Sequence, residues 1–370
     1  MRLLALAGEV ATTVAQIRLA TPLQALCAQR GWTLVLKSFH DCAAADLAQA
    51  DVLIVQRADS ARVLRLQRRM RQRGGAVVHD IDDLLSEIPD HISNQAVVRS
   101  RVRCLRQCLI EADVISVSTA RLGRELGLPR CMEVPNHGWG QGEGALPSQH
   151  QSAPVTLLFA SSDRLATDFI YAAVRAQVGV QVEVVGPPGE DFELAGVHVR
   201  RHPLMARAAF MDFARSLPNP LAVIPLEDSR FAACKSAVKW FDYALAGVPT
   251  LCSAVSPYLD LITNEVTGTL VANEVPAWTA ALQRAVADAD WRLCVAQAAR
   301  TQVLAGHGLD HSVSAWERAI RAARDHRASL TLPAPGRAAR LLDGISDALH
   351  AGARQLRVLN RARLARRARR

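Results

Sequence analysis

The chain has 370 residues, half of which are apolar, and it carries a formal net charge of +9. This length exceeds what one ordinary hydrophobic core sustains, so we expect two globular domains. No uninterrupted apolar run approaches the ~18 to 20 residues needed to span a bilayer, so we expect any contact with a membrane to be made at its surface.

The eight cysteines are spread over long gaps and include no C-x-x-C pair. No histidine lies near them at the spacing of zinc ligands. The pattern favours a reduced, cytoplasmic protein without a structural metal.

Short β-rich runs alternate with helix-length stretches, the order expected of parallel sheets covered by helices. The first series lies at residues 2–8, 33–39, 51–56, 75–81, 113–119 and 131–136. The second series lies at residues 155–161, 181–186, 197–202, 221–226, 250–255 and 268–273. We therefore predict an α/β fold with two doubly wound, Rossmann-like domains that face each other across a cleft.

Between the two series, residues 137–154 (HGWGQGEGALPSQHQSAP) are rich in Gly, Pro, Ser and Gln, as a linker would be. This places an N-terminal domain at 1–136, a C-terminal domain at 155–325 and a tail at 326–370. Ligands of doubly wound sheets bind at the carboxyl ends of the strands, where helix N-termini present N–H groups suited to phosphate.

Two loops after predicted strands supply candidate ligand contacts. Arg18 follows the first strand of the N-terminal domain and is a candidate for contact with a phosphate or an acceptor. Ser161, Ser162 and Arg164 follow the first strand of the C-terminal domain, where a phosphate loop would lie. The alternative for this second loop is an ordinary polar turn that caps a helix.

The segment CKSAVKWFDYALAGVPTL, residues 234–251, holds two of the three lysines in the chain. We predict a helix from about Cys234 to Ala246, ended by Gly247. At about 100° per residue, Lys235, Lys239 and Asp242 would share one narrow stripe of an otherwise apolar helix.

Two ammonium groups on one stripe of a buried helix repel each other and lose hydration, at a cost of several kcal/mol per ion unless something compensates. A diphosphate would compensate, with its roughly two to three negative charges. The alternative is a partly solvated helix in which Lys239 pairs with Asp242 three residues on. Because arginine fills nearly every other basic position, the retained lysines favour the diphosphate.

This segment resembles the nucleotide-sugar-binding segment of GT-B glycosyltransferases, in the family-4-like group of cell-surface polysaccharide synthesis. Members of that group resemble a K-S-x-x-K-x-x-E-Y-x-A-x-G-x-P pattern. This chain matches the pattern at Lys235, Ser236, Lys239, Tyr243, Gly247 and Pro249. The chain departs from the pattern at Asp242, where Glu is usual, and at Leu245, where Ala is usual. VVHDIDDLLSEIP and GTLVANEVPAWTAALQRAVADADWR also look like stretches of the group, so the resemblance covers about residues 1–325.

The resemblance implies a metal-independent enzyme without a cofactor, whose donor is a nucleoside-diphosphate sugar. Lys235 and Lys239 would hold the diphosphate and stabilise charge on the departing nucleotide. Ser236 and Tyr243 would belong to the donor site, and Asp242 would hydrogen-bond the ribose. The group usually has a Glu that contacts the sugar at the position of Cys234, which is a weak donor and a poor acceptor.

The stretch HDIDD offers two other functions. Asp80 and Asp82 imitate a metal-binding D-x-D, and clustered carboxylates suit Mg²⁺ or Mn²⁺. Because the resemblance is to metal-independent enzymes, we prefer Asp82 as an acceptor-side base or orienting group. The structural alternative is a helix cap at Asp82 or Asp83, and we expect His79 to be a core or rim histidine.

The tail at 326–370 contains eleven arginines and two aspartates, which account for the whole net charge. We expect it to be helical or disordered. Each exposed arginine near an anionic membrane contributes on the order of 1 kcal/mol, so the tail could hold the protein at the inner membrane face. A solubilising tail is the alternative, whereas nucleic acid is disfavoured because the body is neutral and lacks a nucleic-acid-binding module.

These features predict a glycosyltransferase that moves a sugar from a nucleoside-diphosphate donor to a glycan or lipid-linked acceptor. One alternative is a catalytically inactive GT-B-like module that binds nucleotide or glycan in a larger assembly, which Cys234 motivates. Another is an enzyme of the same architecture that epimerises a nucleotide sugar. The base, the sugar, the acceptor and the stereochemical course stay open.

Overall fold

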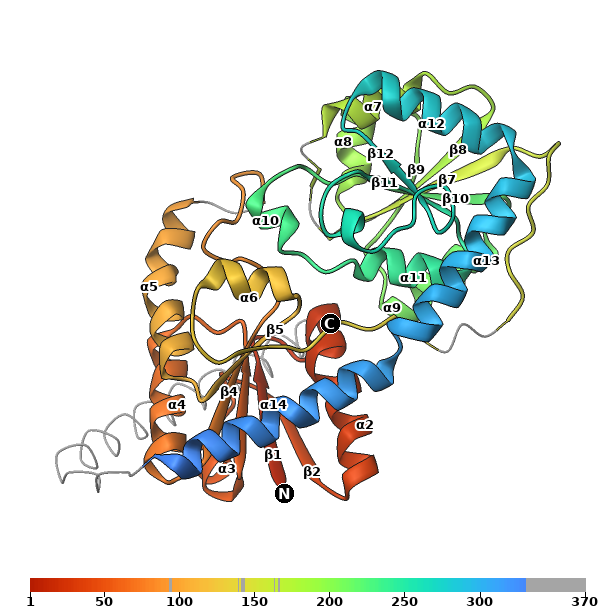
Figure 1. Cartoon of the computed structure of the whole chain (residues 1–370). Helices are drawn as coiled ribbons and strands as arrows, with labels where there is room; N and C mark the ends of the chain where they lie inside the picture. The colour runs from red at the N-terminus through yellow and green to blue at the C-terminus, as the bar shows by residue number, and fades with distance from the viewer. Residues whose placement is uncertain (93–94, 139, 141–143, 163, 166, 331–370) are drawn as a thin grey trace, which may run out of the picture. The chain divides into compact units, whose positions relative to one another are not determined.

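The computed structural model describes residues 1–330 except 93–94, 139, 141–143, 163 and 166. It divides into two compact units (Figure 1). The first comprises Met1–Asp80, Cys104–Ser116 and the chain from Glu317 onward, and the second comprises Ile81–Arg103 and Val117–Trp316. The predicted tail lies outside the described residues from position 331.

The first sheet has the strand order β2-β1-β3-β4-β5-β6. Its strands are β1 (Arg2–Ala7), β2 (Thr33–Ser38), β3 (Val52–Gln56), β4 (Ala76–Ile81), β5 (Val114–Val117) and β6 (Cys131–Glu133). The described pairings of β1 with β2, of β1 with β3 and of β3 with β4 are parallel. Every residue of β3 and β4 is buried, as expected of parallel strands covered on both faces.

Helices connect these strands along the first half of the chain. They are α1 (Thr13–Ala15), a π-helical turn (Gln16–Ala20), α2 (Thr21–Arg30), α3 (Ala44–Gln49), α4 (Ala61–Gln72), α5 (Gln95–Glu111) and α6 (Ala120–Leu126). The last described helix, α14 (Leu309–Ser329), ends within the first unit, where Arg321 lies over the ring of Trp32. The structure thus assigns residues 317–325 to the first unit, whereas the sequence placed them in the C-terminal domain.

The second sheet has the order β12-β11-β10-β7-β8-β9 and is parallel throughout. Its strands are β7 (Val155–Ala160), β8 (Val180–Val185), β9 (Arg200–His202), β10 (Pro220–Ile224), β11 (Thr250–Ser253) and β12 (Thr269–Val271). Strands β7 and β10 are neighbours in this sheet. The chain continues from β7 to β8 on one side of the pair and from β10 to β11 on the other, so the topological switch point lies between β7 and β10. All twelve predicted strands are confirmed.

Two helical layers cover the second sheet (Figure 1). One layer holds α9 (Arg207–Ser216), α11 (Val238–Ala246) and α13 (Ala289–Gly306), whose apolar residues share one core cluster with Leu158 and Ile224 of the sheet. The other holds α7 (Asp168–Arg175), α8 (Pro188–Leu194) and α12 (Val275–Ala287), built around the buried Trp278. Short helical turns lie at Arg230–Ala233 (α10) and Tyr258–Asp260.

The helix predicted from Cys234 to Ala246 is wrong at its N-terminal end. The chain forms α10 up to Ala233, then a link at residues 234–237, and only then α11. Within the link, the N–H of Lys235 donates to the carbonyl of Ala232 at 3.0 Å, which closes α10. Lys235 therefore lies outside the helix that carries Lys239.

No described helix combines the length and the apolar character that a membrane crossing would require.

A glycine brings two loops of the second unit together at the carboxyl edge of its sheet. Gly186 follows β8 with a φ of +92°, a backbone region that disfavours residues with a Cβ. A Cβ at this position would overlap the carbonyl oxygen of Ser161, which follows β7. The N–H of Ser161 in turn donates to the carbonyl of Val185 at 3.1 Å. The position of Ser161 thus depends on glycine at 186.

We expect Gly186→Ala to lower the free energy of unfolding by about 2 to 4 kcal/mol, because strain at positive φ adds to displacement of the Ser161 backbone. Gly179→Ala is the matched control in the same unit: its φ is +71° but nothing lies within 4 Å of an added Cβ. That variant should lose only about 1 kcal/mol. Urea unfolding followed by tryptophan fluorescence compares them, and equal losses would contradict the close approach.

Candidate functional site

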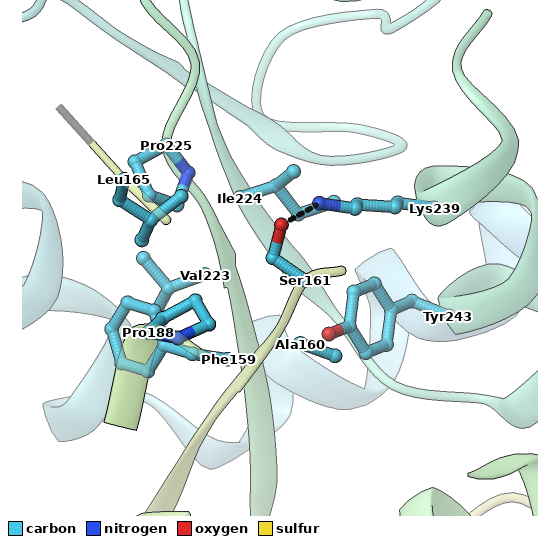
Figure 2. Close-up of a pocket in the computed structure, with 10 residues that line it drawn as sticks. All are labelled: Phe159, Ala160, Ser161, Leu165, Pro188, Val223, Ile224, Pro225, Lys239 and Tyr243. Carbon is cyan, nitrogen blue, oxygen red and sulfur yellow. Dashed lines mark hydrogen bonds between the residues drawn. The ribbon is translucent and has the colours of Figure 1, made fainter. Parts of the chain in front are cut away.

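A pocket lies at the switch point of the second sheet, where β7 and β10 end (Figure 2). Its walls are apolar and include Leu165, Pro188 and Pro225. Its polar groups are the hydroxyl of Ser161, the ammonium group of Lys239 and the phenol of Tyr243. An apolar pocket with a few convergent polar groups at a switch point is the usual form of a ligand site in such sheets.

Lys239 enters the pocket from the first turn of α11. Its Nζ donates to Oγ of Ser161 at 3.2 Å, which joins the helix to the loop after β7 (Figure 2). The N-terminal turn of a helix adds partial positive charge from its N–H groups. The structure therefore concentrates positive potential on the pocket side of Ser161.

Tyr243 lies one turn after Lys239 and is 1% exposed. Its hydroxyl points toward Ala160 at the end of β7 (Figure 2). Within the described part of the chain this hydroxyl has no hydrogen-bond partner, although burying an unpaired hydroxyl costs free energy. Burial raises the pKa of Tyr243 well above its usual value, so the phenol stays neutral and can donate.

The structure places Lys235 outside the stripe that the sequence predicted, and it places Ser236 beside Asn136. Nζ of Lys235 lies 3.4 Å from Oδ1 of Asp83 and 4.4 Å from the ring centroid of Phe231. Oγ of Ser236 accepts from Nδ2 of Asn136 at 2.8 Å. The predicted shared stripe for the two lysines is wrong, because the link at residues 234–237 turns Lys235 toward other partners.

Asp242 forms a buried ion pair with Arg207, the first residue of α9. Nε of Arg207 donates to Oδ2 at 2.8 Å and Nη2 donates to Oδ1 at 2.5 Å, with the two side chains 5% and 11% exposed. The alternative pairing of Lys239 with Asp242 is thus replaced by a bidentate pair with arginine. Both carboxylate oxygens that were expected to meet a ribose already accept from this guanidinium.

Arg18 and Asp80 form a second buried pair, in the first unit. Nη2 of Arg18 donates to Oδ1 of Asp80 at 2.6 Å, and Oγ of Ser116 donates to the same oxygen at 2.7 Å. Arg18 is 1% exposed, so the structure places it inside the unit rather than where a phosphate or acceptor could reach it. Asp80 is thus paired with the guanidinium of Arg18, where the D-x-D hypothesis would have placed a metal ion. Among the described residues, no group of three or more His, Cys, Asp or Glu is arranged to hold a metal ion.

Asp82 lies just after β4 and is 7% exposed. Its carbonyl accepts from Oγ of Ser118 at 2.8 Å. The predicted alternative of a helix cap at Asp82 or Asp83 is wrong, because the next helix, α5, begins at Gln95. His79 is a core histidine as predicted: it is fully buried, and burial lowers its pKa to about 4.

The loop after β7 uses its residues differently from the prediction. Ser161 contacts Lys239, whereas Ser162 is exposed. Arg164 donates to Glu190 at 2.6 Å and to Asp191 at 2.5 Å, so acidic residues in the first turn of α8 hold its guanidinium. Ion pairs of Arg164 thus join this loop to α8, and Ser161 gives the loop a polar contact with the pocket.

Cys234 is fully buried in the link before α11. Burial raises the pKa of its thiol to about 11, so the sulfur is neutral near pH 7 and is a poor nucleophile or base. Its carbonyl accepts from Oγ1 of Thr119 at 3.0 Å. At the position where the resembling group has a carboxylate, this chain offers no charge.

Two residues that shape the site were missed from the sequence. Gly186, in the run VVGPPG after β8, had an available signal, because glycine directly after a strand often marks a close backbone approach. Arg207 had none: it lies 35 residues before Asp242, and nothing near it in sequence indicates an ion pair across two helices.

A scan against protein-family models and a search of curated proteins each find no match. Solved structures do match. Sucrose-phosphate synthase from Thermosynechococcus elongatus superposes with a TM-score of 0.66 at 15% identity, over 87% of this chain and 98% of that one. HepE from Anabaena, in complex with UDP-glucose, superposes with a TM-score of 0.59 at 14% identity, over 86% and 99%. The likeness at these identities concerns the fold, and it confirms the prediction that the chain has the GT-B fold.

Proposed function

We propose that the chain is a glycosyltransferase that transfers a sugar from a nucleoside-diphosphate donor to a glycan or lipid-linked acceptor, without a metal ion. The observation that carries this proposal is the contact of Lys239 with Ser161 in a pocket at the switch point of the second sheet. A GT-B fold with a cation at this place suits a reaction in which a nucleoside diphosphate is the leaving group.

Each pocket group has a role in the proposed reaction. Negative charge builds up on the diphosphate as the bond to the sugar breaks, and the ammonium group of Lys239 stabilises that charge. The hydroxyl of Ser161 and the neutral phenol of Tyr243 donate hydrogen bonds to phosphate oxygens. The N-terminal turn of α11 adds the partial charge of its N–H groups.

Three further residues keep their predicted roles as part of this proposal. Lys235 and Ser236 lie in the link that leads into α11, and they complete the donor site when Lys235 exchanges Asp83 for a phosphate. Asp82 acts as the acceptor-side base or orienting group. Ser162, Arg18 and Asp242 are less suited to contact the donor, because the first does not line the pocket and the other two are held in ion pairs.

The structures of HepE suggest which nucleotide to test first, since HepE has been determined with UDP and with UDP-glucose. We propose UDP-sugars as the first donor series. For the acceptor, the arginine-rich sequence from residue 326 suits a lipid-linked glycan at an anionic membrane surface, where the basic residues would hold the protein.

A non-enzymatic module that binds nucleotide or glycan is the second candidate, and Cys234 favours it. The thiol is buried and neutral where a charged group would assist sugar transfer. Such a module would bind a nucleoside diphosphate without turning over a donor sugar. Incubation with UDP-glucose, followed by chromatography of the products, separates hydrolysis or transfer from simple binding and from isomerisation of the sugar.

We expect the wild-type protein to bind one of UDP, GDP, ADP and TDP, and Lys239→Ala to weaken that binding about tenfold or more, because a charge-assisted contact to phosphate is lost. Lys37→Ala is the control, since Lys37 pairs with Asp46 at 2.7 Å in the first unit. Titration calorimetry measures both variants. A protein that binds none of the four nucleotides, or a Lys239→Ala variant that binds as well as wild type, would remove the proposed donor site.

We expect Tyr243→Phe to keep or raise the free energy of unfolding by up to about 1 kcal/mol, because the variant removes a buried hydroxyl that has no hydrogen-bond partner among the described residues. The same variant should weaken nucleotide binding about three- to tenfold, since a donor to phosphate is lost.

Ser253→Ala is the matched control for this hydroxyl deletion. Ser253 is also fully buried, but its Oγ accepts from the N–H of Leu226 at 2.8 Å. Its loss should cost about 1 to 3 kcal/mol of stability. A Tyr243→Phe variant that loses as much stability as Ser253→Ala would show that the phenol serves the fold instead of the pocket.

A further inference from the structure

Helix α11 places a carboxylate next to the cation of the pocket. Asp242 follows Lys239 by three residues, and side chains at this spacing are neighbours, with Cβ atoms roughly 5–6 Å apart. A carboxylate that turned toward Lys239 would attract its ammonium group and oppose the approach of an anionic ligand. The site therefore depends on where this carboxylate is held.

Arg207 holds Asp242 by both oxygens. The fork of the guanidinium donates from Nε and Nη2, and its Nη2 also donates to the carbonyl of His137 at 2.7 Å. Bidentate pairs of arginine with carboxylates are the strongest and most directional ion pairs in proteins, and burial strengthens this one. A lysine at position 207 would supply the same charge without the fork.

We propose that Arg207 is a positioning residue for anion binding by Lys239. By fixing the carboxylate of Asp242 on the α9 side, Arg207 keeps it from turning toward the ammonium group three residues away, where it would oppose an anionic ligand. This inference rests on the proposed function for its ligand, a nucleoside diphosphate. The charge relation between positions 207, 242 and 239 is independent of any ligand.

A purely structural role for Arg207 is the competing explanation. Helices α9 and α11 also meet through Phe210 and Tyr243, whose rings make an edge contact at 5.7 Å between centroids. Loss of Arg207 could loosen this packing and displace Lys239 with it. The two explanations predict different results when the charge of Asp242 is removed as well. Anion binding should then recover only if Arg207 acts through electrostatics.

The test compares Arg207→Gln with the double variant Arg207→Gln/Asp242→Asn, and uses UDP and inorganic pyrophosphate as ligands. Arg207→Gln should weaken binding of both about tenfold, since the released carboxylate competes for the ammonium group. The double variant should regain affinity to within about threefold of wild type, because its amides carry no charge and can still hydrogen-bond. Arg207→Lys keeps the cation but not the fork, so its affinity should fall between those of wild type and Arg207→Gln.

A second readout needs no ligand. Acetic anhydride reacts with a lysine side chain only when its amine is neutral. A carboxylate close to Lys239 would favour the ammonium form, which does not react. Arg207→Gln should therefore slow the acetylation of Lys239 about tenfold, as followed by mass spectrometry of its peptide, and the double variant should restore the rate. Lys37 is the internal control in every sample, since it pairs with Asp46 in the first unit.

The outcomes separate this inference from the proposed function. Equal acetylation rates in wild type and Arg207→Gln would overturn the inference even if nucleotides bind. A double variant that stays as weak as the single one would also overturn it, because lost packing would then be the cause. If wild type binds neither ligand, the proposed function fails, while the acetylation rates still decide the charge relation. If Arg207→Gln does not fold, Arg207→Lys takes its place, and an affinity and acetylation rate equal to those of wild type would overturn the inference.

Discussion

Burial of helix α11 is the constraint on which the chemistry of the second unit depends. Every residue from Trp240 to Ala246 is buried, and the helix packs against the sheet, α9 and α13. A helix without a solvent face cannot leave its polar groups in water, so each of them needs a partner or a ligand. Nε1 of Trp240 donates to the carbonyl of Thr267 at 3.0 Å, and Asp242 takes Arg207. Lys239 donates to Ser161 at the pocket, which Tyr243 also lines.

The strands and their order were predictable because the sheets are parallel and covered on both faces. Such strands bury every residue, as β3 and β10 do, and so appear in the sequence as short continuous apolar runs. The twelve predicted runs lie in two series with helix-length segments between them, and this pattern leaves few architectures besides two doubly wound sheets. The position of the pocket follows from the same pattern, since a switch point is fixed by strand order.

The internal partners of the site were not predictable, because they join residues that are far apart in sequence. Asp242 meets Arg207 at a separation of 35 residues, and Asp80 meets Arg18 at a separation of 62. The helical stripe failed for a local reason: it assumed a continuous helix through residues 234–237. That link contains no glycine or proline to announce a break, and Ser229 starts α10 separately by accepting from the N–H of Ala232 at 3.1 Å.

The three lysines now separate into two kinds. Lys37 and Lys235 contact aspartates, so lysine in this arginine-rich chain is not by itself a sign of an anion site. Arginine pairs with the buried carboxylates of Asp80 and Asp242, where a planar fork can use both oxygens at once. Lys239 donates to the hydroxyl of Ser161 in a pocket that Tyr243 also lines. In the proposed donor site, a compact ammonium group would take less space than a guanidinium fork and leave room for a phosphate oxygen beside Ser161.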